Sequence, residues 1–310
     1  MIKVLFSAKD PNWTSYQDPL TAAFVAAGLS VDLSQDHPPA DVDYIVFAPN
    51  GPVRDFTPYI KTRAVLSLWA GVETVVDNAT LTQPLVRMVD DSLTAGMVEW
   101  VTGHVMRHHL EMDTHIHGQD GKWRDAAYPP LARDRIVTIL GIGALGAACG
   151  QALAGLGFQV RGWARTAKAI EGIDCFHGAA GIDAALTDAD FAVLLLPQTP
   201  ETENVLNAAR LDRMKRGSFV INPGRGPLID DHALLSALDR GHIGHATLDV
   251  FRTEPLPADH AYWAHPKVTV TPHIASTTRP DSAARIIADQ IARDQDGQPM
   301  RNVVNRRAGY

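Results

Sequence analysis

The sequence has few cysteines, no long apolar run and no surplus of basic residues, and each of these features excludes a class of protein. Its cysteines are Cys149 and Cys175 alone, which excludes a disulfide framework and suits a reducing compartment. No uninterrupted apolar segment approaches the ~20 residues that cross a bilayer. Acidic residues outnumber basic ones, 35 to 28. Because no basic cluster could follow a phosphate backbone, nucleic acid is not expected as a partner.

Length and composition describe an ordinary globular protein. Hydrophobic residues make up 45% of the chain and charged residues 20%, as in most soluble folds. A chain of 310 residues favours about two domains over a single core. The first residues, MIKVLFSAKD, lack the longer apolar core and the cleavage site of a secretory signal. We therefore expect a cytoplasmic protein that does not enter a membrane.

Strand-like and helix-like patterns alternate along the chain in two series. In the first series, residues 2–7, 44–48 and 64–68 are typical of strands, and Pro19–Gly28 is predicted to be a helix that ends at glycine. A second series begins at Arg135 with the strand-like segment RIVTIL. Strands separated by helices indicate parallel sheets with crossover helices. The pattern predicts an α/β fold with a domain boundary near residue 95.

A histidine-rich stretch lies between the two series. Residues 94–117 are predicted to be helical, with His104 and His108 at i, i+4 spacing and His109 after them. A zinc site is conceivable, but no cysteine and no HExxH pattern accompanies these histidines. We predict an exposed or interfacial helix without a metal.

A glycine turn follows the strand-like segment RIVTIL. Gly141, Gly143 and Gly146 have G-x-G-x-x-G spacing and are followed by a helical pattern. In this context the first glycine makes a tight turn, the second lets the backbone approach a pyrophosphate, and the third lets the helix pack on the strand. The N–H groups at the helix start then face the phosphates. The segment predicts a dinucleotide site, and a purely structural turn is the alternative.

The end of the next strand, FQVRGW, indicates which dinucleotide is bound. An acidic residue at this place would bind the ribose hydroxyls of NAD, but the chain reads Trp163-Ala164-Arg165-Thr166, followed by Lys168. Arg165 and Thr166, with Lys168 as a further candidate, can hold a 2′-phosphate through charge-assisted hydrogen bonds. We predict NADP(H) as the preferred cofactor, with NAD(H) possible. The alternative is that Arg165 is a plain surface cation.

Three further side chains suggest chemistry on a small carboxylate. Arg225 stands between Gly224 and Gly226 just after the strand-like FVIN, and its guanidinium matches a carboxylate, although a structural salt bridge is the alternative. Glu254 and His273 lie in later loops, and a carboxylate beside an imidazole favours the imidazolium form. Ligands bind outside the carboxyl ends of strands in open α/β sheets, where all three are expected. His273 is therefore the candidate proton donor.

The order and context of these segments resemble one enzyme family. NPGRGPLID at 222–230, LDVFRTEPLP at 248–257 and TPHIAS at 271–276, together with GIGALG and LPQTPET, resemble the D-isomer-specific 2-hydroxyacid dehydrogenases. Within that family, the chain length and the segments WAGVE and WARTAK resemble the bacterial glyoxylate/hydroxypyruvate reductases of type A. Formate dehydrogenases of this fold carry glutamine where Glu254 stands, which argues against formate as the substrate.

The resemblance implies the domain organisation. Residues 96–276 would form a Rossmann-type doubly wound cofactor domain, and residues 1–95 with 277–310 a discontinuous, flavodoxin-like substrate domain. The active site would lie in the cleft between them. The family is commonly homodimeric through the cofactor domain, so a homodimer is expected, with the 94–117 stretch as a candidate contact.

The resemblance also implies a role for each site residue. Arg225 would anchor the substrate carboxylate together with the backbone amides of Ala70 and Gly71. His273 would be the acid/base and Glu254 its partner. The residues implied to contact the cofactor are Gly141, Gly143, Ala144, Leu145, Gly146, Trp163, Arg165, Thr166, Pro197, Thr202 and Asp249. Of these, Asp249 would contact the nicotinamide carboxamide.

The predicted function is NADPH-dependent reduction of glyoxylate to glycolate and of hydroxypyruvate to D-glycerate. A reductase of larger 2-keto acids is the alternative within the same class. A non-catalytic, dinucleotide-sensing binding protein is the alternative from another class. The presence of Arg225, Glu254 and His273 together argues against a sensor, because a sensor needs no proton donor.

Overall fold

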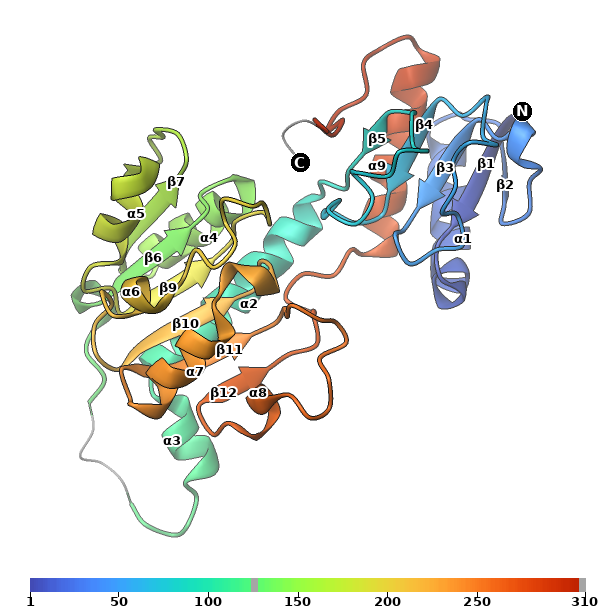
Figure 1. Cartoon of the computed structure of the whole chain (residues 1–310). Helices are drawn as coiled ribbons and strands as arrows, with labels where there is room; N and C mark the ends of the chain where they lie inside the picture. Colours follow the sequence, from blue (N-terminus) through green and yellow to red (C-terminus); the bar gives the residue numbers. More distant parts are fainter. Residues whose placement is uncertain (124–127, 307–310) are drawn as a thin grey trace. The chain divides into compact units, whose positions relative to one another are not determined.

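The computed structural model describes residues 1–123 and 128–306, and the chain divides into two compact units. Unit 1 comprises Met1–Leu93 and Thr278–Tyr310, of which 307–310 lie outside the described residues, and unit 2 comprises Thr94–Thr277. Each unit contains its own parallel sheet (Figure 1). The prediction of an α/β fold with a Rossmann-type and a flavodoxin-like part is confirmed by the strand orders described below.

The sheet of unit 1 has the strand order β2-β1-β3-β4-β5, which is the flavodoxin-like doubly wound order. Neighbouring strands of this sheet run parallel. Its strands are β1 (Ile2–Ser7), β2 (Val31–Ser34), β3 (Tyr44–Phe47), β4 (Ala64–Ser67) and β5 (Leu85–Val86). The short 3-10 helix η1 (Pro39–Asp41) precedes β3. The short apolar runs expected at 44–48 and 64–68 are therefore neighbouring strands.

Two helices that are far apart in sequence cover one face of this sheet. They are α1 (Asp10–Ala26) and α9 (Pro280–Gln295). Leu20 and Phe24 of α1 and Ile287 and Ile291 of α9 join one buried cluster with the sheet side chains. Adjacent strand residues point to opposite faces. The strand side chains on the other face, such as Leu5 and Ile45, form a second buried cluster with side chains of the connecting loops. The C-terminal helix is thus part of the N-terminal core.

The helix α1 begins earlier than the sequence predicted. The expected start at Pro19 is wrong, because the helix begins at Asp10 and Pro19 lies inside it. Proline is favoured in a first helical turn and removes one backbone hydrogen bond elsewhere. Here Tyr16, Leu20 and Phe24, at i, i+4 and i+8, are all buried. Packing of this apolar face outweighs the lost bond.

The sheet of unit 2 has the strand order β12-β11-β10-β9-β6-β7-β8. From β6 the chain runs outward through β7 and β8 and then returns to the other side of β6 at β9, which makes β6 and β9 the point where the strand order reverses. The strands are β6 (Ile136–Leu140), β7 (Gln159–Ala164), β8 (Asp174–His177), β9 (Phe191–Leu194), β10 (Ser218–Asn222), β11 (Ile243–Leu248) and β12 (Val268–Val270).

Helices cover both faces of the second sheet (Figure 1). Buried side chains of α2 (Asp91–His109) and α4 (Ala144–Gly155) pack on one face. Those of α5 (Gly178–Leu186), α6 (Ala208–Leu211) and α7 (Asp231–Asp239) pack on the other face. The remaining short elements of unit 2 are η2 (Ala132–Asp134), η3 (Gly226–Leu228) and α8 (Ala261–Ala264). This two-sided cover makes the sheet doubly wound.

The histidine-rich stretch differs from its prediction in two ways. It is not one helix, because α2 ends at His109 and α3 (Met112–His117) begins after Glu111, whose φ of 53° is left-handed. It is also not exposed throughout, because only 3% of His108 and 5% of His109 is accessible. The regular spacing indicated a helix correctly, but it did not show that its last turn packs on the sheet.

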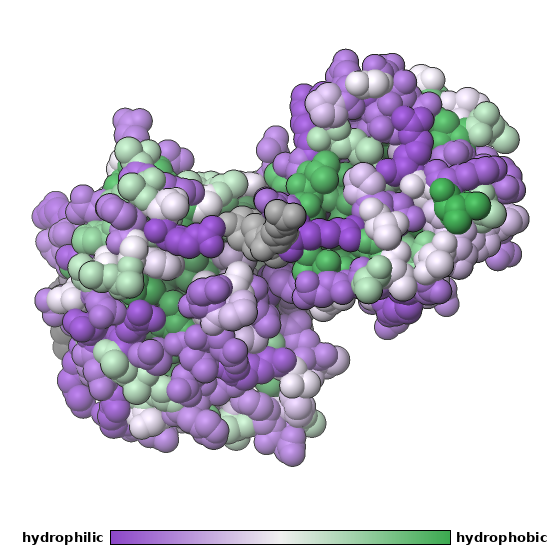
Figure 2. Space-filling model, turned by 45° about the horizontal axis from the view of Figure 1, so that its top comes forward, coloured by the Kyte–Doolittle hydropathy of each residue, from purple (hydrophilic) through white to green (hydrophobic). Residues whose placement is uncertain are grey.

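The surface seen in Figure 2 is mainly hydrophilic in both units, with smaller hydrophobic patches. Among the described residues, no helix combines the length and the apolar character needed to cross a membrane.

Candidate active site

The carboxyl edge of the unit 2 sheet gathers most of the predicted site residues. Strand β6 ends directly before Gly141, β7 directly before Arg165 and β11 directly before Asp249. Strand β10 ends at Asn222, three residues before Arg225. Strand β12 leads in the same way to His273. Because neighbouring strands of this sheet run parallel, these loops share one edge. Such an edge, at the point where the strand order reverses, is where open α/β sheets bind ligands.

The glycine turn between β6 and α4 has the shape that a bound phosphate needs. Gly141 has a φ of 106°, and a Cβ there would lie 2.6 Å from the Leu195 carbonyl carbon. A Cβ at Gly146 would overlap the Gly141 carbonyl oxygen. Beside Gly143, by contrast, an added Cβ would meet nothing within 4 Å. This open space lies at the start of α4, where the N–H groups of Ala144 and Leu145 have no partner inside the helix.

The exit of β7 carries cations and no carboxylate. Arg165 and Thr166 are exposed directly after the strand. The Trp163 indole N–H donates to the Gly178 carbonyl at 2.8 Å, which fixes the ring beside the strand end. The Lys168 ammonium donates to the Ile142 carbonyl in the glycine turn at 2.9 Å. The β7 exit therefore places basic side chains next to the glycine turn.

The loop after β9 is held by one of its predicted cofactor residues. The Thr202 hydroxyl donates to the Pro197 carbonyl at 2.7 Å and accepts from the Thr199 N–H at 2.8 Å. In the same loop the pKa of Glu201 is lowered, first by its own backbone N–H, then by the Thr199 side chain, and also by the positive charge of Arg165. The β7 and β9 exits therefore interact electrostatically.

Arg225 sits in a loop whose backbone is closely packed. The Asn222 side chain accepts from Gly224 N–H at 3.1 Å and donates to the Arg225 carbonyl at 2.9 Å. The Arg225 guanidinium donates to the Gly224 carbonyl at 2.6 Å. A side chain at Gly226 would overlap the Phe251–Arg252 peptide. The glycine lets the Arg225 loop lie directly against the loop that carries Glu254.

Glu254 and His273 form an ion pair. Glu254 Oε2 lies 2.7 Å from His273 Nδ1, and Glu254 Oε1 accepts from the Phe251 N–H at 2.9 Å. Burial opposes the charged form of Glu254, but the hydrogen bonds from His273 and Phe251 and the charges of His273 and Arg225 lower its pKa overall. The hydrogen bond to Glu254 raises the pKa of His273 against the opposing effect of burial. The imidazole is thus favoured as a cation, with Nε2 on the side away from Glu254.

Asp249 has a structural task that the sequence did not indicate. It is fully buried. Its carboxylate accepts from the Thr271 hydroxyl at 2.6 Å and from the N–H groups of Ile274 and Ala275 at 2.9 and 2.8 Å. These bonds brace the turn in which His273 adopts a left-handed φ of 54°. The sequence motif shows an acidic residue after β11. Only the structure shows that this residue accepts hydrogen bonds from residues before and after His273.

The remaining predicted substrate residues, Ala70 and Gly71, belong to unit 1. They follow β4 at the carboxyl edge of that sheet and are partly accessible. The Ser67 hydroxyl accepts from the Trp69 N–H at 3.0 Å and donates to the Trp69 carbonyl at 3.0 Å. This local bonding shapes the turn just before the two amides.

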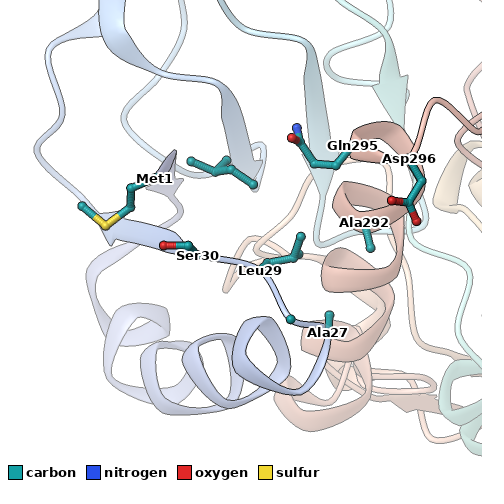
Figure 3. Close-up of a pocket in the computed structure, with 9 residues that line it drawn as sticks. Met1, Ala27, Leu29, Ser30, Ala292, Gln295 and Asp296 are labelled. Carbon is teal, nitrogen blue, oxygen red and sulfur yellow. The ribbon is translucent and has the colours of Figure 1, made fainter.

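A hollow of about 370 Å³ in unit 1 lies elsewhere (Figure 3). It is lined by residues from the start of β1, the turn after α1 and the end of α9, including Ile2, Leu29 and Gln295. This is the amino edge of the unit 1 sheet, opposite the edge of Ala70 and Gly71. The hollow is therefore separate from the predicted substrate residues of unit 1.

The histidines of α2 do not form a metal centre in the described part of the chain. No group of three or more histidine, cysteine, aspartate or glutamate side chains there could hold an ion. His108 instead bonds to Thr247 at 2.9 Å and stacks on Phe219. Burial, with smaller electrostatic contributions from His245 and Arg107, lowers the pKa of His108 to about 3, so it is a neutral core residue.

Comparisons with known proteins agree on one family. The model of the D-isomer-specific 2-hydroxyacid dehydrogenase NAD-binding domain matches residues 101–275. Glyoxylate/hydroxypyruvate reductase A of Serratia proteamaculans is 37% identical over 259 residues, which cover 81% of this chain and 82% of that protein. The same enzyme of Photorhabdus laumondii is 36% identical over 256 residues, or 80% of this chain and 82% of its own.

Solved structures agree over the whole chain. A D-isomer-specific 2-hydroxyacid dehydrogenase of Xanthobacter autotrophicus, in complex with NADPH and MES, has a TM-score of 0.91 at 37% identity, covering 100% of this chain and 99% of that one. An NADPH-dependent glyoxylate/hydroxypyruvate reductase of Sinorhizobium meliloti, in complex with NADP and sulfate, has a TM-score of 0.88 at 34% identity, covering 100% of both chains.

Proposed function

The chain belongs to the D-isomer-specific 2-hydroxyacid dehydrogenases, and we propose that it reduces glyoxylate to glycolate and hydroxypyruvate to D-glycerate with NADPH. The observation that carries this proposal is the pairing of His273 with Glu254 at 2.7 Å, on the sheet edge that also carries Arg225 and the glycine turn. The relatives named as glyoxylate/hydroxypyruvate reductases support the choice of substrates.

Residues 94–277 fit NADPH at two places. The open space beside Gly143 and the first N–H groups of α4 suit the pyrophosphate. Arg165 and Thr166 suit the 2′-phosphate, because the residues that directly follow β7 include no acidic side chain to bind a free ribose hydroxyl. The structures of two relatives with NADPH or NADP support the same preference. When bound, this cofactor supplies the hydride that reduces the carbonyl carbon.

The side chains of the candidate site can supply the rest of the reaction. The Arg225 guanidinium is proposed to bind the substrate carboxylate, whose geometry it matches, and the amides of Ala70 and Gly71 are proposed as further donors. His273 gives its Nε2 proton to the carbonyl oxygen as that oxygen becomes a hydroxyl. Glu254 holds Nδ1 and stabilises the imidazolium before transfer. His273 becomes neutral and regains a proton from water before the next turnover.

Turnover assays test this proposal directly. Oxidation of NADPH and of NADH is followed with glyoxylate, hydroxypyruvate, pyruvate and a longer 2-keto acid. We expect the highest kcat/KM with NADPH and the two smallest polar substrates. A clear preference for the longer keto acid would reject the proposed substrates, and tight NADPH binding without any turnover would reject the enzyme activity itself.

We also propose that the protein is a cytoplasmic homodimer. In unit 2, α3 and residues 118–123 follow the end of α2 (Figure 1), and this part exposes Met112, Ile116 and Trp123, the last with 91% of its surface accessible. Exposed apolar side chains in such number favour burial against another molecule, here a second copy. The cytoplasmic location is supported by the free thiols Cys149 and Cys175. Sedimentation of the wild type and of Ile116→Glu tests the dimer, since we expect the variant to be monomeric.

A further inference from the structure

Arg252, a loop residue, bonds to several acceptors from other parts of unit 2. It lies two residues before Glu254, and one-third of its side-chain surface is accessible. One nitrogen donates to the Ile229 carbonyl at 2.6 Å and to the Asn204 side chain. The other nitrogens lie 3.3 Å from Glu203 Oε1 and 3.3 Å from Asp231 Oδ2. A planar fork of donors can satisfy several acceptors at fixed angles in this way.

These acceptors belong to two segments that are already joined to each other. The Asn204 N–H donates to the Pro227 carbonyl at 2.8 Å, and the Leu206 N–H donates to the Leu228 carbonyl at 3.0 Å. The second segment continues directly from Arg225. Arg252 therefore binds its own loop to the stretch of chain that leaves the Arg225 loop.

The two loops also touch through their backbones. Gly226 packs on the peptide between Phe251 and Arg252 so closely that a Cβ there would overlap it. The N–H of Phe251 in turn donates to Glu254 Oε1 at 2.9 Å. A continuous set of contacts thus runs from the Arg225 loop through the 251–252 peptide to Glu254 and then to His273.

We propose that Arg252 is a positioning residue, which fixes the Glu254 carboxylate against His273 by clamping the Glu254 loop to the Arg225 loop. This inference rests on the proposed function for the roles of Glu254 and His273. Arg252 itself has no part in binding the substrate or transferring the proton.

The effect of Arg252 on His273 is one of geometry. The charged groups that act most strongly on His273 are Glu254, Arg225 and Asp249. The charge of Arg252 is instead matched by Glu203 and Asp231 in its own cluster. Removing the guanidinium should therefore act on His273 only by letting Glu254 move away.

The test compares Arg252→Gln and Arg252→Lys with a matched control, Arg240→Gln, in the full-length protein. Arg240 is also an arginine of unit 2 with an aspartate partner, Asp212, but it lies at the end of α7 away from these loops. The titration of the His273 imidazole is followed by NMR, with His273→Gln used to assign the signal. The pH profile of kcat/KM for glyoxylate is measured in parallel, and thermal unfolding shows how much of each variant is folded.

In Arg252→Gln we expect the His273 pKa to fall. The value of kcat/KM should drop at least about tenfold at pH 8.5 and less at pH 6, because general acid catalysis typically contributes ~10²–10⁴-fold and the variant loses part of it. Arg252→Lys should be intermediate, because a single ammonium cannot reach all the acceptors. An unchanged His273 titration in Arg252→Gln would overturn the proposal, and so would a loss of kcat/KM that is equal at all pH values or equally large in Arg240→Gln.

The two readouts separate this inference from the proposed function. If the wild type reduces neither glyoxylate nor hydroxypyruvate, the proposed function fails. The NMR titration does not depend on turnover, so a lowered His273 pKa in Arg252→Gln would still support the positioning role, and an unchanged one would reject it.

Discussion

Glu254 Oε2 lies 2.7 Å from His273 Nδ1, while the other carboxylate oxygen is held by the Phe251 N–H at 2.9 Å. Both members of the pair are therefore held in place. The Phe251 N–H holds Glu254, and Asp249 holds the turn that carries His273. A proton donor needs a defined direction as well as a suitable pKa. The bond at Nδ1 supplies both, since it orients the ring and favours the charged form.

Replacing Glu254 by glutamine should change the pH dependence of reduction. His273 is proposed to act as an acid, so the rate falls as pH rises through its pKa. Glu254 raises that pKa, and Glu254→Gln should lower it. We expect the fall in kcat/KM to begin at a lower pH than in the wild type, as measured from pH 5.5 to pH 10 with saturating NADPH. An alkaline limb that stays in place would show that Glu254 does not control this proton.

Replacing His273 by glutamine should remove the proton donor and leave cofactor binding intact. General acid catalysis typically contributes ~10²–10⁴-fold, so kcat for glyoxylate reduction should fall by about that factor. The dissociation constant of NADPH, measured by fluorescence titration, should stay near the wild-type value. Turnover at the wild-type rate would exclude His273 as the proton donor.

Arg165→Ala should weaken NADPH binding selectively. A hydrogen bond to a charged group contributes about 1.5–3 kcal/mol, which corresponds to roughly a 10- to 100-fold rise in the dissociation constant. NADH lacks the 2′-phosphate and should bind almost as before. Arg165→Lys is the matched variant, because it keeps the charge and should lose less. The same loss for both cofactors would mean that Arg165 does not contact the 2′-phosphate.

The sequence predicted best what depends on position along a strand. Gly141, Arg225 and His273 were expected at strand exits, and parallel pairing then places strand exits at one edge. Their close packing could not be read in this way. Gly226 lies against the 251–252 peptide, and this contact joins two loops that are far apart in the sequence. For the same reason the hydrogen bonds from Ile274 and Ala275 to Asp249 were missed. The contact of Asp249 with the nicotinamide carboxamide stays a prediction.

Helix burial was predicted less well than strand position. The start of α1 was wrong because Pro19 looks like a first-turn residue, although tertiary packing tolerates it inside the helix. The burial of His108 was missed because histidine is amphipathic and its side of the helix is fixed only by contact with the sheet. Both errors arise where packing outweighs local preference.

The buried His108 leads to a prediction about stability. Burial lowers its pKa to about 3, with further lowering by His245 and Arg107 and an opposing effect of Asp113. In the unfolded chain a histidine titrates near 6.5. Between these values the unfolded chain binds a proton that the folded protein does not. The contribution of His108 to stability is therefore fully present above pH 6.5 and decreases as the pH falls towards 3, by up to ~1.4 kcal/mol per pH unit.

Urea unfolding at pH 7.5 and at pH 5 measures this loss. We expect His108→Gln to be less stable than the wild type at pH 7.5, because the stacking on Phe219 is lost. Because glutamine does not titrate, the variant should lose less stability than the wild type on acidification. His117→Gln, at an exposed position of α3, is the matched control and should keep the wild-type slope. Equal slopes for the wild type and His108→Gln would mean that the folded protein accepts a proton at His108. The ring would then have to find a charged partner, because a lone imidazolium among Phe219, Thr247 and His245 would be strongly disfavoured by desolvation.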